Sequence, residues 1–440
     1  MHESESEEKL PDAPPSKSGE EHPYAVLRNS DFVRYLVGRF VASLGQQMLV
    51  VAIDWELYER THSALPLAFV GLSLMIPMIL CTLPAGHCAD TFSRKKIILI
   101  STFVLGLASV GLALSSALTA PIAWIYVCLV VIGMARTFLW PASAAFVTSL
   151  VSRGQLARAV TFSSGTFQIS SVAGPAACGM VIILAHHTAW AVYALNALAS
   201  FICLGLVWQI RHEHKIKAPE PVTARSLVEG FRFVYQNKII LGTLTLDLFA
   251  VLLGGAVTLL PIYAKDIFHR GPEGLSWLRD AMPVGAVICA IIIAHRPPLQ
   301  KAGRTMLWCV AIFGAATIGF GLIIIPTAMW FWLAGGLLAL AGAVDQISVV
   351  VRQTLVQVLT PDAKRGRVSA VNSLFIGTSN ELGGFRSGFV AYLFATPSFL
   401  GSASATGAII SVVTGGIGTI LVVIVVALVW PEIRKYGRLA

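Results

Sequence analysis

Charged side chains inside long apolar stretches are the residues of this sequence most able to do chemistry. A charge at the centre of a membrane span costs about 2.5–3.5 kcal/mol or more, so its presence there favours a functional role. A carboxylate whose surroundings alternate between dry and wet can take up and release a proton. Three carboxylates fit this description. Glu381 is the first candidate for such a proton-binding group, and Asp54 and Asp345 are the next two.

Four further polar side chains lie in apolar stretches and are candidates to line a substrate cavity: Arg39, Arg136, Gln46 and Asp247. A different interpretation stays open for all of these charges, because ion pairs between neighbouring helices also bury charge. Asp345 and Arg352 are seven residues apart and therefore share one helical face. Asp54 lies near the predicted outer end of its helix, where it could instead reach the membrane interface.

The sequence shows none of the patterns that predict enzyme catalysis. It has no nucleotide-binding loop, no zinc-ligand spacing and no nucleophile with a nearby base. Its seven cysteines lie in or beside apolar stretches without a CxxC pair, which indicates small buried hydrophobes. We therefore predict no enzyme activity, no metal and no cofactor, and an ion gradient as the energy source.

The elements that hold these side chains are predicted to be membrane-spanning helices. Of the 440 residues, 56% are hydrophobic and 12% are charged, against roughly 25% charged in soluble domains. A spanning helix needs about 20 apolar residues. Such segments recur at 33–59, 64–89, 96–118, 122–149, 157–185, 188–210, 239–264, 273–295, 304–326, 328–352, 368–396 and 404–430. The sequence thus predicts an all-α membrane protein with twelve transmembrane helices.

The basic residues predict how these helices cross the membrane. With the N-terminus placed in the cytoplasm, the only Lys and Arg on the outer side are Arg60, Lys265 and Arg270. Cytoplasmic loops of membrane proteins carry an excess of Lys and Arg. Both termini are therefore expected in the cytoplasm, and the net charge of +9 indicates topology and not nucleic-acid binding.

The chain divides into two halves at a polar stretch near residue 211. The predicted organisation is a disordered cytoplasmic tail (1–30), a six-helix bundle (31–210), a cytoplasmic linker (211–238), a second six-helix bundle (239–432) and a cytoplasmic tail (433–440). Residues 226–235 in the linker form an amphipathic pattern. The halves also share a glycine spacing, because Gly174 and Gly179 recur as Gly383 and Gly388. The shared spacing indicates that the two halves are related.

The stretch between the second and third apolar segments carries an acid followed by basic residues: Gly86-His-Cys-Ala-Asp90-Thr-Phe-Ser-Arg94-Lys95-Lys96. It resembles the G-x-x-x-D-[RK]-x-G-[RK]-[RK] loop of the major facilitator superfamily, with matches at Gly86, Asp90, Arg94 and Lys95. The resemblance implies two pseudo-symmetric six-helix bundles and a cytoplasmic gate. In it, Asp90 would dock on the N-terminus of the eleventh helix, near Arg365 and Arg367.

Residues 170–179 carry Gly174, Pro175 and Gly179 with the spacing of a second pattern of that superfamily, G-x-x-x-G-P-x-x-G-G, which is associated with antiporting exporters. Proline bends the helix and small residues admit a partner helix. Any tightly packed, kinked helix is the competing explanation.

Residues 38–63, 230–233 and 361–368 are similar to the branch of enterobactin exporters and macrolide-efflux proteins. Many members of that branch have an acid where this chain has Gln46. The resemblance implies a monomer in the bacterial inner membrane, embedded in lipid, that exports a small amphipathic molecule, siderophore or drug-like, in exchange for protons. Import or lipid flipping by the same fold, and a sensor or scaffold without transport, stay open.

Overall fold

The structure, a computed structural model, describes residues 25–211, 224–296, 301–396 and 402–437. Helices and short connections make up these ranges. Residues 1–24 of the expected N-terminal tail, residues 212–223 of the expected linker and residues 438–440 at the C-terminus lie outside the described ranges.

The first half forms a bundle of six long helices. They are α1 (Ser30–Thr61), α2 (Leu65–Thr91), α3 (Arg94–Ala117), α4 (Ala123–Leu150), α5 (Leu156–Leu184) and α6 (Trp190–Trp208). The first is capped by Asn29, whose side chain accepts hydrogen bonds from the backbone N–H groups of Asp31 and Phe32. Rising about 1.5 Å per residue, each of the six is long enough to cross the roughly 30 Å hydrocarbon layer or nearly so.

The second half forms an equivalent bundle after a short helix, α7 (Ala224–Gln236). Its long helices are α8 (Lys238–Gly254), α10 (Pro272–Ala294), α11 (Ala302–Gly321), α12 (Ala328–Leu359), α13 (Asp362–Leu393) and α14 (Ala403–Val429), and the short α15 (Pro431–Lys435) follows. The span that begins with α8 is broken after Gly254. It continues through a 3-10 turn (Val257–Leu259), α9 (Leu260–Ile262) and a π-helical turn (Tyr263–Ile267).

Arg386 on α13 explains how the break in this span is tolerated inside the bundle. A helix end leaves carbonyl oxygens without intrahelical partners. The guanidinium of Arg386 donates to the carbonyl of Leu253, 2.9 Å away, and to that of Ser411, 3.3 Å away. The arginine therefore binds backbone oxygens of both α8 and α14.

Eleven segments of the described chain are long and apolar enough to span a membrane, counting Lys238–Ile267 as one. The remaining long helix is α13, whose 32 residues include several charges. Two predicted loop boundaries were wrong. Gly86 to Asp90 belong to α2, and α3 begins at Arg94, so the expected loop shrinks to two residues. The predicted span at 368–396 begins too late, because α13 starts after Pro361 and Lys364 to Arg367 lie in its first turns.

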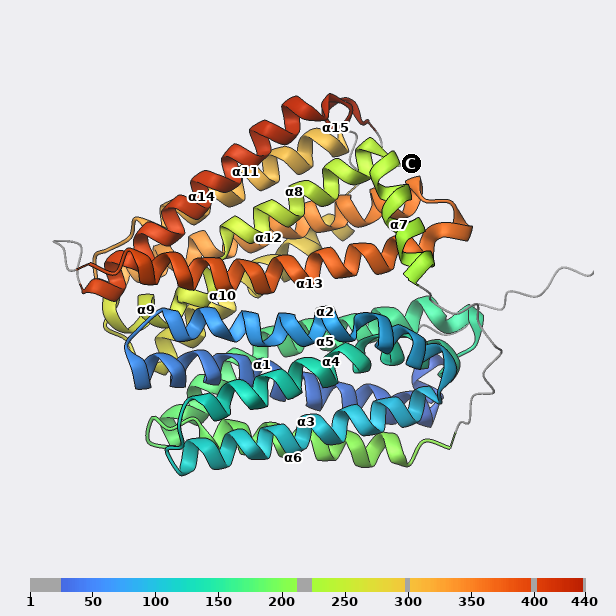
Figure 1. Cartoon of the computed structure of the whole chain (residues 1–440), viewed down its shortest axis with the longest axis horizontal. Helices are drawn as coiled ribbons and strands as arrows, with labels where there is room; N and C mark the ends of the chain where they lie inside the picture. Colours follow the sequence, from blue (N-terminus) through green and yellow to red (C-terminus); the bar gives the residue numbers. More distant parts are fainter. Residues whose placement is uncertain (1–24, 212–223, 297–300, 397–401, 438–440) are drawn as a thin grey trace, which may run out of the picture.

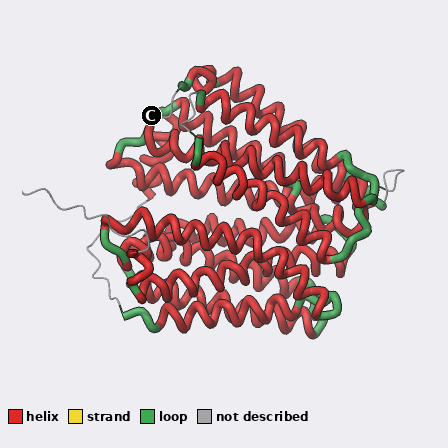
Figure 2. The backbone as a smooth tube through the Cα atoms, turned by 180° about the vertical axis from the view of Figure 1, so that it is seen from behind, coloured by secondary structure: helices red, strands yellow, loops and turns green. Residues whose placement is uncertain are grey.

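The two bundles lie side by side with their helices roughly parallel, α1–α6 in one layer and α8–α14 in the other (Figures 1 and 2). They meet through two helix pairs, α2 with α13 and α5 with α10. Both ends of the described chain lie at the end of the molecule that also holds α7, here named the α7 end. The opposite end, which holds α9, is named the α9 end.

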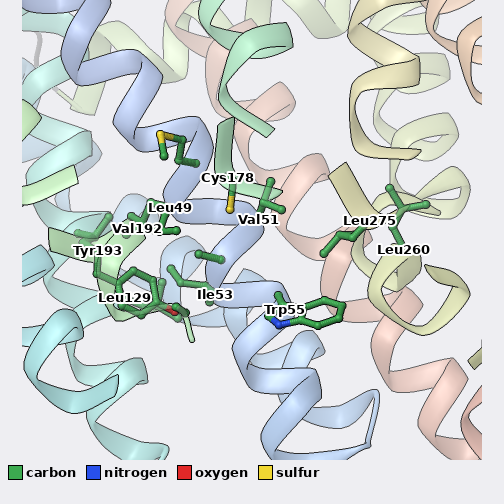
Figure 3. Close-up of a cluster of buried hydrophobic side chains, with 14 of the residues drawn as sticks. Leu49, Val51, Ile53, Trp55, Leu129, Cys178, Val192, Tyr193, Leu260 and Leu275 are labelled. Carbon is green, nitrogen blue, oxygen red and sulfur yellow. The ribbon is translucent and has the colours of Figure 1, made fainter. Parts of the chain in front are cut away.

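One apolar core is continuous between the bundles at the α9 end. It joins residues of α1 and α4–α6 to Leu260, Leu275 and other residues between Ala256 and Leu278, and Figure 3 shows α1 between the two groups. Towards the α7 end, the second bundle has two separate apolar clusters built from its own helices together with α7 and α15. The structure is therefore a conformation closed at the α9 end.

Candidate functional site

Glu381 lies on α13 where the two bundles meet. Its backbone carbonyl approaches Gly71 of α2 so closely that a Cβ at Gly71 would collide with the oxygen. The carboxyl group is half-buried, and the charges that act on it are those of Arg136 on α4 and Asp54 on α1. An acid of the second bundle thus faces a cation and an acid of the first.

Asp54 on α1 forms an ion pair with Arg279 on α10, and this pair joins the two bundles. The Oδ2 of Asp54 and the Nη1 of Arg279 are 2.8 Å apart. Asp280 adjoins the pair, and its Oδ1 is buried without a hydrogen-bond partner in the described structure. Three acids and two arginines of both bundles therefore share this region.

Asp247 and Asp345 lie at a different place, inside the second bundle. Asp247 on α8 is buried and forms an ion pair with Arg352 on α12. Asp345 lies about two turns before Arg352 on the same face of α12. It is half-buried, and the charges of Asp247 and Arg352 act on it. The structure thus separates the three candidate proton carriers, because Glu381 and Asp54 lie at the interface and Asp345 does not.

The other two cavity candidates lie on α1. Arg39 is half-buried, and its charge acts on Tyr35 of the same helix and on Cys203 of α6. Gln46 has a side-chain amide nitrogen that is buried and has no hydrogen-bond partner in the described structure. Among the described residues, neither side chain belongs to the group formed by Glu381, Arg136 and Asp54.

Polar contacts join the bundles at the α9 end, above the Asp54–Arg279 pair. Three of them, here named the rim contacts, are the hydroxyl of Tyr58 to Asp266 (2.7 Å), the ammonium of Lys265 to Glu59 (2.5 Å) and the hydroxyl of Ser404 to the carbonyl of His62 (2.8 Å). Lys265 and Asp266 belong to the π-helical turn. In two of the rim contacts, the residue from the second bundle therefore belongs to the broken span.

The basic residues of the first motif bind the ends of helices in their own bundle. Arg94 donates to the carbonyl of Ala145 on α4 (3.3 Å), and Lys95 to those of Trp208 (2.9 Å) and Ile210 (2.6 Å) at the end of α6. Cations favour helix C-termini. Gly86 lies within α2.

The side chains of Asp90 and Arg365 lie outside the described residues, so the expected gate contact stays a prediction. Arg367 is described, and its guanidinium forms an ion pair with Glu229 of α7, 2.6 Å away. The start of α13 is thereby attached to the helix that precedes the second bundle.

The glycine spacing shared by the halves has a structural counterpart. A Cβ at Gly174 would collide with the side chain of Gln47 on α1, and one at Gly383 would lie 2.8 Å from the carbonyl of Val251 on α8. Each first glycine therefore packs on the first helix of its own bundle. Pro175 follows Gly174 inside α5 and is buried.

The second glycine of each repeat packs against the other bundle. A Cβ at Gly179 would lie 3.0 Å from the Cβ of Ser276 on α10, and one at Gly388 would lie 2.8 Å from the Cβ of Ala68 on α2. Sequence reasoning missed this role, and it also missed Arg279 as the partner of Asp54. The five-residue spacing was a usable signal for the glycines, whereas no local pattern pairs α1 with α10.

Two bundles of six helices that meet around shared charges define a membrane transporter of the alternating-access type. The family model described as Major Facilitator Superfamily matches residues 35–384. The chain belongs to that superfamily.

Among curated proteins, the chain is 27% identical to "Enterobactin exporter EntS" of Shigella flexneri, over 92% of this chain and 93% of the relative. It is 28% identical, over the same shares, to the protein of that name from Escherichia coli O6:K15:H31 (strain 536 / UPEC).

Solved structures resemble the fold at low sequence identity. A bacterial homolog of the human lysosomal transporter Spinster, in an inward-facing and unoccupied conformation, is 13% identical with a TM-score of 0.69, covering 92% of this chain and 98% of that chain. The nucleoside transporter NupG is 11% identical with a TM-score of 0.72, covering 90% and 99%.

Proposed function

We propose that this protein is a secondary active exporter of the bacterial inner membrane that exchanges protons for an amphipathic organic molecule, siderophore or drug-like. The similarity to enterobactin exporters over 92% of the chain supports the direction and the substrate class. The α7 end carries nearly all basic residues outside the spans, so it is assigned to the cytoplasm together with both termini. The described conformation is then closed towards the outside.

The observation that carries the proposal is the position of Glu381. It comes from the second bundle, lies at the interface and faces Arg136 and Asp54 of the first. Rocking of the bundles changes which of these charges it faces and how much water reaches it. Proton binding and conformation are coupled in this way, with Glu381 as the proton carrier and Arg136 as its counter-charge.

Residues 31–210 and 239–432 move as the two bundles, joined by 211–238. The transporter works as a monomer surrounded by lipid, and its transported partners are one small molecule and protons. Arg39 and Gln46 stay candidates to line the substrate cavity. Asp247 would do so only in another conformation, because it is here paired with Arg352.

Transport into inside-out vesicles tests the proposal. The vesicle lumen is made acidic, and the accumulation of radiolabelled catecholate and hydroxamate siderophores and of lipophilic cations is followed together with lumen pH. We expect accumulation of at least one compound, accompanied by substrate-dependent proton loss from the lumen and abolished by a protonophore. Accumulation in right-side-out vesicles alone would identify an importer, and no proton movement with any transported compound would contradict proton exchange.

A further inference from the structure

The ion pair between Asp54 and Arg279 differs from the other polar contacts at the α9 end in its burial. The side chains of Asp54 and Arg279 are 6% and 18% exposed, whereas those of the rim pair Glu59 and Lys265 are 45% and 29% exposed. An exposed pair contributes little because water screens it. A buried pair whose partner is removed leaves a charge in apolar surroundings at a high cost.

The surroundings of Asp54 offer one cation and several acids. On α10, Arg279 is the cation that acts on Asp54, and Asp280 adjoins it with a buried, unpartnered oxygen. On α13, the charge of Asp54 acts on Glu381. On α5, the charges of both Asp54 and Arg279 act on the thiol of Cys178.

The remaining groups near this part of α1 have other partners. Glu56 of the same helix is paired with Arg60, 2.5 Å away, and Tyr193 of α6 faces Glu56. Arg136 of α4 acts on Glu381. Arg279 is therefore the counter-charge of Asp54 in the closed conformation of the described residues.

Opening of the α9 end must break this pair, because α1 and α10 belong to different bundles. Asp54 then loses its cation while its neighbours Ile53 and Trp55 are both buried apolar residues. An ionised carboxylate in such surroundings is costly, and binding a proton removes the cost.

We propose that the Asp54–Arg279 pair is a proton-operated lock at the α9 end: ionised Asp54 holds the bundles together there, and protonated Asp54 releases them. This inference rests on the proposed function and adds to it a second proton-binding site with a distinct task. Glu381 carries the exchanged proton, whereas Asp54 sets which end is closed. Acid outside favours the outward-open state, and the pair reforms when Asp54 loses its proton.

Spin-label distances across the α9 end, recorded at a series of pH values without substrate, test the lock. Labels at Thr119→Cys and Thr327→Cys, both exposed and on opposite bundles, report opening in a background whose seven native cysteines are replaced. We expect the ratio of open to closed molecules to fall with rising pH, by up to about tenfold per unit as one proton is released. Asp54→Asn should keep the end open at every pH.

The control variant is Glu59→Gln, which removes the exposed rim pair from the same helix and should keep the pH dependence. The double variant Asp54→Asn/Arg279→Gln removes both charges, so it avoids an unpaired buried arginine and should also lose the pH dependence. A wild-type pH dependence in either Asp54 variant overturns the lock, as does its loss in Glu59→Gln. Because no substrate is present, failure here leaves the transport proposal untouched, and failure of transport leaves this measurement interpretable.

Discussion

At the scale of single residues, the function depends on acids that lie where the two bundles meet. Glu381 is placed there by close backbone packing of α13 on α2 at Gly71, and its electrostatic partners come from the other bundle. The sequence identifies such residues because each charge is costly in hydrocarbon. It does not identify their partners, since Asp54 and Arg279 are far apart in the chain and meet only through the packing of α1 near α10.

Replacing Glu381 with Gln removes the proposed proton carrier while keeping its size. We expect proton-driven accumulation in vesicles to be lost, whereas exchange of labelled for unlabelled substrate continues, because exchange needs no net proton movement. Asp345→Asn, which changes a carboxylate inside the second bundle, is the matched control and should keep proton-driven transport. Full proton-driven transport by Glu381→Gln would transfer the role to Asp54 or Asp345.

The buried Asp247–Arg352 pair predicts an effect on stability. Arg352→Met leaves Asp247 without its partner and should lower the free energy of unfolding in detergent by about 3–5 kcal/mol. Asp247→Asn/Arg352→Met removes both charges and should recover most of that loss, with transport retained. If the double variant is stable but does not transport, Asp247 belongs to the substrate cavity after all.

At the scale of helices, small residues decide where the bundles touch. Gly179 and Gly388 occupy equivalent positions of the two repeats, and each packs against the opposite bundle. The repeat was visible in the sequence as a five-residue spacing. Helix ends were less predictable, because hydropathy falls before a helix ends, and polar turns such as Arg94 to Lys96 still belong to α3.

Gly179→Val should favour opening at the α9 end. Its side chain would overlap Ser276 across the interface, and overpacking costs about 1–3 kcal/mol. The Thr119–Thr327 spin-label distance measures the resulting increase in open molecules. Gly165→Val on the same helix has no neighbouring atom within 4 Å and should leave the distance unchanged. Equal changes in this distance for the two variants would show that valine acts by altering α5 itself and not by overlap at the interface between the bundles.

At the scale of the whole molecule, composition was enough to predict long membrane-spanning helices, because lipid requires long apolar helices. Their grouping into two bundles was predicted from the family resemblance and the repeated glycine spacing. The break after Gly254 was not predicted, since the apolar pattern continues through it. Only the structure shows that this broken span bears Lys265 and Asp266, which close the α9 end.

The assigned orientation predicts which thiols a membrane-impermeant reagent reaches in intact cells. A cysteine at His269, which is exposed at the α9 end, should be labelled from outside, and one at Gln236, exposed on α7, should be labelled only after the cells are opened. Both positions lie outside the long helices, so the variants should fold normally. The reverse labelling pattern would invert the topology and with it the direction of transport.

The claim that the bundles must part at the α9 end during transport is tested most directly by tying them together there. Glu59→Cys and Lys265→Cys replace a pair of exposed side chains that bridge the bundles at 2.5 Å. A short bifunctional methanethiosulfonate should cross-link this pair and stop proton-driven transport, while the same reagent leaves each single-cysteine variant active. Reduction of the cross-link should restore transport. Transport at an undiminished rate by fully cross-linked protein would contradict alternating access through this end.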